Sequence, residues 1–307
     1  MNSVFPEYDI YIAPDGTEVR FDRTSDRFIQ TFDGYGMSPI KYLEQQGAFQ
    51  HGVSIYDYRL QKRVIQWTIR QNGCSRWDYW EKRGDILNLL RPNRHTVNNF
   101  GPGKLRKFLP DGTMRDIDVH LELGPIFSSP QGFWDEWGFT EVIRFIATDP
   151  TFYDPTSGSL VWNLGPAQTQ LVFPITFPIQ FGYTIISGSN TITYTGTWMT
   201  FPTITIRGPI AGLILTNTTT GEKIQLNYKV KAGETVTISL VFGNKTVTNQ
   251  DGTNLIGTVS TDSDLSTFHI APDPEAPGGV NTITASGAAS SPVTRITLSY
   301  YTRYIGI

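Results

Sequence analysis

Acidic and histidine side chains grouped on one strand are the first candidates for chemistry in this sequence. Because side chains alternate across a strand, four of them would share one face: Asp116, Asp118, His120 and Glu122. A zinc-protease site needs two histidines one helical turn apart with a carboxylate, and none of the four histidines has that spacing. We interpret the run as the polar face of an antiparallel strand, turned to solvent or to an interface. We predict no metal and no cofactor.

An aromatic and acidic loop is the second candidate. Its residues are Phe133, Trp134, Asp135, Glu136 and Trp137. Aromatic rings beside two carboxylates could serve a glycosidase, which holds its carboxylates ~5 to 9.5 Å apart, but the sequence supplies no matching partner. Adjacent acids on an exposed aromatic loop are more typical of a contact surface. We therefore predict no enzyme and no catalytic residue, and we keep this loop as a candidate contact surface.

Composition excludes several classes of function. The 307 residues carry a net charge of -3 with both signs well represented, so the basic surface of a nucleic-acid-binding protein is missing. The single cysteine, Cys74, excludes an intramolecular disulfide and fits a reducing compartment. No apolar run approaches ~18 residues, and the N-terminus lacks the pattern of a secretory signal. We expect a protein that assembles in the cytoplasm and inserts into no membrane.

Charge density divides the chain into two domains. Residues 1–150 hold 18 basic and 20 acidic side chains, whereas residues 151–307 hold 7 and 8. The stretch at 151–182 is rich in proline and glycine, which predicts an extended linker. We expect the first domain at 1–150 and the second at 183–307.

The first domain is predicted to be an antiparallel β domain with one helix. Two Asp-Gly turns, at 15–16 and 111–112, lie between alternating segments and predict hairpins. A helix is expected near 75–91, where Ser75 can cap the first turn. We expect its apolar residues to pack on the sheet: Trp77, Trp80, Ile86, Leu87 and Leu90.

The second domain is predicted to be a β-sandwich, because short strands recur between turn signals without any helical period. The expected strands are 190–194, 203–207, 212–217, 223–228, 235–242, 246–249, 281–285 and 294–301. Three aromatic residues, Tyr183, Tyr194 and Trp198, could stack on a sugar. A sandwich core requires about one aromatic residue per short strand in any case, so we favour core packing for them.

Two groups of motifs resemble siphophage distal tail proteins, the ring-forming adaptors at the tip of a long flexible phage tail. The N-terminal group is Gly34-Tyr-Gly36, Gln50-His51-Gly52 and Arg59. The C-terminal group includes Gly196-Thr-Trp198, Pro202-Thr-Ile-Thr-Ile206, Arg207-Gly-Pro209, Lys231-Ala-Gly-Glu234 and Ile296-Thr-Leu-Ser-Tyr-Tyr-Thr-Arg-Tyr304. His51 has no partner that a catalytic template requires, so we interpret the first group as turn geometry in an assembly sheet.

The resemblance implies a structural role in a virion. The expected fold is mainly β, with a split-barrel-like N-terminal domain and a jelly-roll or galectin-like β-sandwich. Such a protein would form a homohexameric ring at the tail tip, assembled in the host cytoplasm. Its expected partners are the tail tube protein and the tail-tip hub or fibre and receptor-binding proteins, with the tape measure protein as a further candidate. The alternative is a module of the tail tip that binds host cell-wall glycan.

Overall fold

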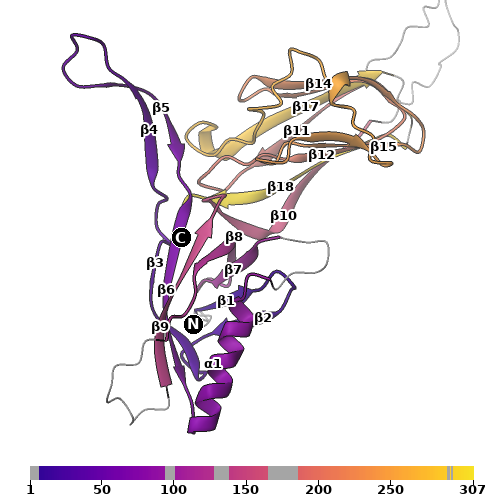
Figure 1. The fold of residues 1–307 in the computed structure, drawn as a ribbon. Coiled ribbons are helices and arrows are strands. Elements are labelled where there is room, and N and C mark those ends of the chain that lie inside the picture. The colour runs from indigo at the N-terminus through magenta and orange to yellow at the C-terminus, as the bar shows by residue number, and fades with distance from the viewer. Residues whose placement is uncertain (1–6, 94–100, 128–137, 165–185, 289–290, 292) are drawn as a thin grey trace, which may run out of the picture. The chain divides into compact units, whose positions relative to one another are not determined.

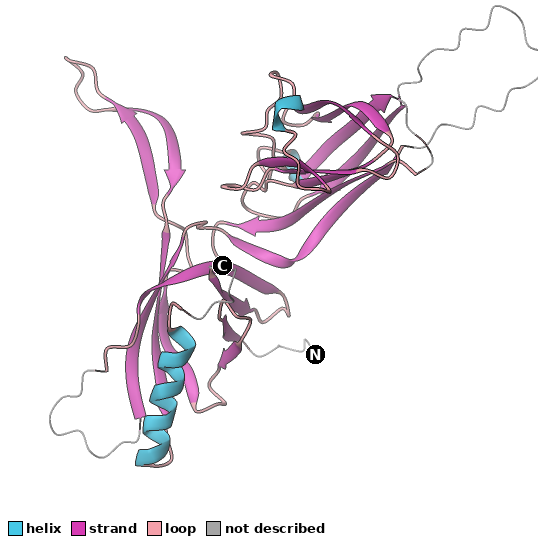
Figure 2. Cartoon of the chain, turned by 45° about the vertical axis from the view of Figure 1, so that its right-hand side comes forward, coloured by secondary structure: helices cyan, strands magenta, loops and turns pink. Residues whose placement is uncertain are grey.

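The computed structural model describes residues 7–93, 101–127, 138–164, 186–288, 291 and 293–307. The chain divides into two compact units: unit 1 comprises Met1–Pro155 and Tyr304–Ile307, and unit 2 comprises Thr156–Arg303. Most of the described structure is antiparallel β-strand, as predicted, with a single α-helix among these residues (Figures 1 and 2). In the part of the chain that is described, no helix combines the length and apolar character needed to span a membrane.

Unit 1 contains two antiparallel sheets that share strand β8 (Met114–Leu123). One sheet has the order β2-β1-β7-β8 and the other has the order β3-β6-β9-β8. The strands are β1 (Tyr8–Ile12), β2 (Glu18–Phe21), β3 (Arg27–Asp33), β6 (Arg63–Asn72), β7 (Gly103–Phe108) and β9 (Gly138–Ala147). The first half of β8 pairs with β7 and the second half pairs with β9, so the sheets close over a common core. Both predicted Asp-Gly hairpins, β1–β2 and β7–β8, are confirmed.

The core of unit 1 is built on strand β6. Its burial alternates along the strand, and Ile65, Trp67 and Ile69 are fully buried between β3 and β9. The Trp67 ring packs edge-on against Phe21 and Phe145, at centroid distances of 5.3 and 5.4 Å. Alternation in the sequence is therefore enough to choose the buried face of this strand.

Helix α1 (Arg76–Leu90) begins where the sequence predicts it. The Ser75 hydroxyl accepts a hydrogen bond from the backbone N–H of Asp78 at 3.1 Å, which caps the first turn. Tyr79 stacks edge-on against Phe139 of β9, with ring centroids 5.9 Å apart. This contact turns the face that contains Tyr79 and Ile86 toward the sheet.

The predicted packing of the two helix tryptophans is wrong. Trp77 is 80% exposed and Trp80 is 54% exposed, and Leu87 is also exposed. The buried helix residues are Ile86, Leu89 and Leu90. The helix carries large apolar side chains on two faces, and spacing alone does not say which of them meets the sheet.

Truncating a side chain on the buried face of α1 should reduce stability much more than truncating one on its exposed face. We expect Ile86→Ala to reduce the free energy of unfolding by about 2–5 kcal/mol, because it leaves a cavity in the core. Trp77→Ala, the larger truncation, should change it by no more than about 0.5 kcal/mol, because its ring is exposed. Chemical denaturation of both variants measures this, and equal losses would contradict the observed orientation of the helix.

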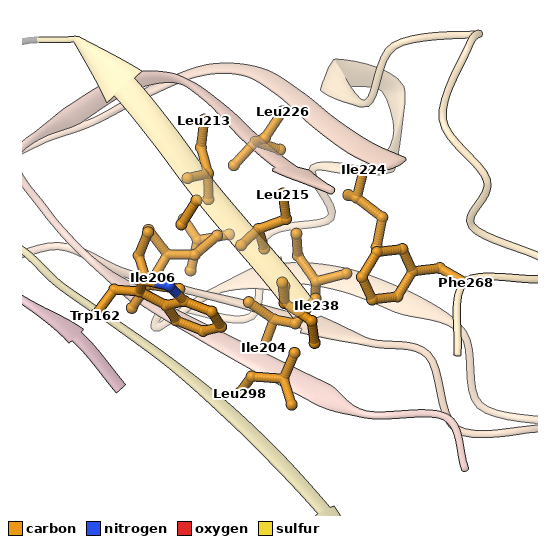
Figure 3. Close-up of a cluster of buried hydrophobic side chains, with 14 of the residues drawn as sticks. Trp162, Ile204, Ile206, Leu213, Leu215, Ile224, Leu226, Ile238, Phe268 and Leu298 are labelled. Carbon is orange, nitrogen blue, oxygen red and sulfur yellow. The ribbon is translucent and has the colours of Figure 1, made fainter. Parts of the chain in front are cut away.

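Unit 2 is a two-layered β-sandwich, as predicted. One sheet has the order β16-β15-β12-β18-β10 and the other has the order β11-β17-β13-β14. The strands are β10 (Phe152–Asn163), β11 (Ile186–Thr193), β12 (Thr203–Arg207), β13 (Ile210–Asn217), β14 (Glu222–Val230), β15 (Thr235–Ser239), β16 (Thr246–Asn249), β17 (Val280–Ala288) and β18 (Arg295–Tyr304). Figure 3 shows Ile204 and Leu298 of one sheet and Leu213 and Leu215 of the other within a single buried cluster.

Strand β10 occupies residues that the sequence predicts to be an extended linker. Trp162 is buried in the sandwich core, and Leu160 packs against that core. Gly158, which lies within the predicted extended linker, makes room for a neighbour: a Cβ there would lie 2.5 Å from Cζ of Tyr300. The prediction of an extended linker is therefore wrong for residues 152–163, and its remainder from 165 to 182 lies outside the described residues.

Candidate functional site

A two-stranded hairpin, formed by β4 (Ile40–Gln45) and β5 (Ser54–Leu60), is the most unusual surface of unit 1. We call residues 40–60 the arm. In the described chain, β4 and β5 pair only with each other. In Figure 1 the arm continues from the ends of β3 and β6 as a separate hairpin. All six residues of β4 are exposed and no residue of β5 is buried, so no layer of side chains among the described residues buries either strand of the arm.

The arm carries apolar side chains on this uncovered surface. Tyr42 of β4 lies directly opposite Tyr58 of β5, and the exposed fractions of these side chains are 51% and 45%. Other exposed apolar residues of the arm are Ile40, Leu43, Phe49, Val53, Ile55 and Tyr56. A group of large apolar side chains on a protruding hairpin is typical of a surface that a protein partner covers.

The Gln50-His51-Gly52 motif forms the tip of the arm. The Gln50 side-chain oxygen accepts from the backbone N–H of Gly47 at 3.1 Å, and its nitrogen donates to the Ser54 hydroxyl at 2.9 Å. Gly52 adopts a φ of +82°, which other residues rarely adopt. His51 is exposed. The motif therefore shapes a turn, as the sequence-based interpretation expects of it.

Arg59 lies near the end of β5, toward the base of the arm. Its guanidinium forms an ion pair with Asp57 two residues earlier on β5. Both side chains are exposed, so the pair contributes little to stability.

Gly34 and Gly36 lie at the base of the arm, between β3 and β4. Gly34 has a φ of +92°, and a Cβ there would lie 2.1 Å from the carbonyl oxygen of Val64. The carbonyl oxygens of both glycines accept from Nη1 of the buried Arg63, at 2.6 and 2.5 Å. The six motif residues singled out in the sequence therefore lie along one hairpin, from its base to its tip.

A closed network of polar side chains lies in unit 1. The Tyr35 hydroxyl donates to Asp9 at 2.7 Å and accepts from the Trp67 indole at 3.0 Å. Lys107 donates to the other oxygen of Asp9 at 3.1 Å. Burial raises the pKa of Asp9, against the opposing charge of Lys107, and burial together with Asp9 raises the pKa of Tyr35 well above its usual value. The groups satisfy one another, which suits a structural role.

The acidic run on β8 is held in a similar way. Asp116 is fully buried and accepts from Arg106 Nε and Nη2 at 2.8 and 2.9 Å. Asp118 accepts from the Tyr153 hydroxyl at 2.8 Å. The interpretation of this face as turned to solvent or an interface is thus wrong for Asp116, because this carboxylate is buried and forms an ion pair with Arg106. Across the described residues no group of three or more His, Cys, Asp or Glu side chains could hold a metal ion.

Unit 2 contains a charged cluster that no sequence motif indicates. The buried His269 ring places Nδ1 2.7 Å from the Thr267 carbonyl oxygen and 3.1 Å from Glu222, and it places Nε2 3.0 Å from Glu275. Burial disfavours the charged form of His269, but the hydrogen bonds that its ring donates to Glu222 and to the Thr267 carbonyl outweigh burial and raise the pKa of His269 to about 9. Glu222 and His269 are too far apart in sequence for a local pattern to pair them.

The His269 cluster makes the stability of the protein depend on pH. Because the folded pKa is raised above the unfolded value near 6.5, the stabilisation is complete below about pH 6.5 and is lost as pH rises through about 9. We expect a loss of about 1–3 kcal/mol, after allowing for partial solvent screening. Urea unfolding at pH 6 and pH 10 measures it. His269→Gln should remove most of the difference, whereas His51→Gln in the exposed arm should retain it.

The other candidate site residues lie either in the core of unit 2 or outside the described residues. Tyr194 is buried, and its hydroxyl donates to the Trp198 carbonyl at 2.7 Å and accepts from the Arg303 N–H at 2.8 Å. Tyr194 is therefore a core residue rather than a sugar platform, as we favoured. Tyr183 and the loop of Phe133, Trp134, Asp135, Glu136 and Trp137 lie outside the described residues.

Comparisons with known proteins find one matching family model and several solved structures of similar fold. The family model for the siphovirus-type tail component, C-terminal domain, matches residues 195–304. The crystal structure of the Dit protein (gp 19.1) of phage SPP1 has a TM-score of 0.62 and 15% identity, covering 97% of this chain and 98% of that chain. A chain of the phage P2 baseplate in its activated conformation with calcium has a TM-score of 0.48 and 12% identity, covering 96% and 98%. A search of curated proteins finds no match. The resemblance to siphophage distal tail proteins is confirmed.

Proposed function

We propose that this chain, whose residues 195–304 match the family model for the siphovirus-type tail component, is a distal tail protein that forms a homohexameric ring. The ring would join the tail tube to the hub, fibre or receptor-binding proteins of the tail tip, with the tape measure protein as a further partner. In this role the protein is structural rather than enzymatic. It is assembled in the host cytoplasm and resides in the tail of the virion.

The arm is the observation that carries this proposal. Its apolar side chains are exposed on a two-stranded hairpin, and such a hairpin alone is at best marginally stable in water. A second copy of the chain can cover the arm of the first while its own arm extends to a third. A contact of this kind joins different surfaces of successive copies. It generates a closed ring when the rotation from one copy to the next adds up to a full turn after a whole number of copies.

The remaining surface of unit 1 fits an assembly role as well. Trp77 and Trp80 are exposed on α1, and the guanidinium of Arg83 lies 4.9 Å from the Trp80 ring. Tryptophan and arginine are enriched among the residues that carry most of the binding energy in protein interfaces. We assign this helix surface to a contact within the tail.

The mass of the purified protein tests the proposal. Native mass spectrometry and electron microscopy should show a closed ring of six chains. A protein that stays monomeric at high concentration, with both units folded, would refute the ring and leave the arm without its proposed occupant.

A further inference from the structure

Arg63 is a buried charge that the proposed ring does not use. Its exposed fraction is 1%, and its guanidinium donates to backbone carbonyls: Nε to Pro150 at 2.7 Å, Nη1 to Gly34 and Gly36, and Nη2 to Ile305 at 2.6 Å. The Phe152 ring lies 4.7 Å from the guanidinium carbon. A planar fork of five N–H donors suits this arrangement, whereas the ammonium of lysine cannot reach four carbonyls in these directions.

The partners of Arg63 define the base of the arm. Gly34 and Gly36 precede β4, and Arg63 itself follows β5 by three positions. The two segments that connect the arm to unit 1, before β4 and after β5, are also joined directly. The Gln61 N–H donates to the Pro39 carbonyl at 2.8 Å, and the Ser38 hydroxyl donates to the Gln61 carbonyl at 3.0 Å. Arg63 thus holds the segment before β4 against the start of β6, at the point where the arm leaves the sheet.

One of the four carbonyl partners of Arg63 comes from the other end of the chain. Residues 304–307 belong to unit 1, although Tyr304 is the last residue of β18, whose other residues belong to unit 2. The Ile305 carbonyl accepts from Arg63, and the Ile307 N–H donates to the Tyr35 carbonyl at 3.0 Å. Gly306 approaches the Gly-x-Gly turn so closely that a Cβ on it would lie 2.8 Å from the Gly36 carbonyl oxygen.

We propose that Arg63 and residues 304–307 form a latch that sets the direction in which the arm leaves unit 1. Without the latch the arm would be attached to unit 1 only through the two connecting segments, because neither of its strands pairs with another described strand. The buried carbonyls of the Gly-x-Gly turn would also lose their donor, which favours a rearranged turn. Only the consequence for assembly rests on the proposed ring, since the latch itself lies within one chain.

Distance measurements within the full chain test the latch. Spin labels at Glu44→Cys on the arm and Glu81→Cys on α1, in a Cys74→Ser background, report the direction of the arm; both positions are exposed. Labelled protein is mixed with excess unlabelled protein, so that each oligomer holds one labelled copy. We expect one narrow distance distribution in the parent protein. Arg63→Lys should widen it, and Gly306→Val should widen it without touching Arg63. Lys62→Met, which removes an exposed neighbouring charge, should leave it unchanged.

The two latch variants separate direction from stability. A narrow, unchanged distribution in both Arg63→Lys and Gly306→Val would overturn the latch even if their melting temperatures fell, because a merely stabilising contact predicts no movement of the arm. If Arg63→Lys fails to fold, Gly306→Val and the milder Gly306→Ala decide the question. A monomeric parent protein with a narrow distribution would refute the ring and support the latch, so the two proposals fail independently.

Discussion

Replacing Tyr42 with aspartate is expected to convert the proposed ring into folded monomers. Tyr42 lies at the centre of one face of the arm, opposite Tyr58, and about half of its side chain is exposed. A charge placed in the desolvated centre of an interface typically costs about 2–4 kcal/mol per contact, which lowers the association constant about 30- to 1,000-fold. The same change should alter the stability of the isolated chain by no more than about 0.5 kcal/mol, because an exposed side chain has little to lose.

Size and fold must be measured together for this variant. Light scattering gives the mass of the Tyr42→Asp protein, and circular dichroism and chemical unfolding show whether its units remain folded. Asn227→Asp is the matched control, because it adds the same charge to an exposed strand position of unit 2. An intact ring in Tyr42→Asp would show that this face of the arm takes no part in the contact between copies. Loss of the ring in both variants would show that added charge alone is responsible.

The two glycines of the Gly-x-Gly turn should respond very differently to the same substitution. Gly34→Ala is expected to destabilise unit 1 by at least about 3 kcal/mol, because alanine is strained at a φ of +92° and its Cβ would lie 2.1 Å from the Val64 carbonyl oxygen. Gly36→Ala should cost less than about 1 kcal/mol, because a Cβ there meets nothing within 4 Å and no positive φ is required.

Chemical denaturation of both alanine variants checks this difference. Gly36→Ala is the control, since it makes the same chemical change two residues away and keeps the carbonyl that Arg63 binds. Equal stability of the two variants would contradict the close approach of Gly34 to strand β6. A shift of the ring equilibrium in Gly34→Ala without loss of stability would assign this glycine to the assembly surface instead.

Local features of the sequence predicted much of the fold. The expected strands at 203–207 and 246–249 coincide with β12 and β16, and the Ser75 cap marks the start of α1. These predictions succeed because turn conformation, capping and side-chain alternation depend on residues a few positions apart. The buried faces of strands follow for the same reason.

Predictions that depended on distant neighbours failed or could not be made. Trp77 was expected in the core and is exposed, because the choice between two apolar helix faces is made by Phe139 on another strand. Gly158 was interpreted as part of a linker, and only Tyr300 explains why a glycine stands there. The contact of His269 with Glu222 joins the start of β14 to a segment 47 residues later in the sequence, which no local pattern pairs.

The sequence by itself determined the β class of this protein, the positions of its turns and an order of motifs that resembles siphovirus-type tail components, whose C-terminal domain model matches residues 195–304. Only the tertiary structure decided that the Gly-x-Gly motif lies at the base and the Gln-His-Gly motif at the tip of one exposed arm, and that Arg63 holds this base through carbonyls of distant segments. The physical reason is the range of the interactions: turns and strands follow from neighbouring residues, whereas exposure and buried hydrogen bonds depend on what the rest of the chain brings to the same place.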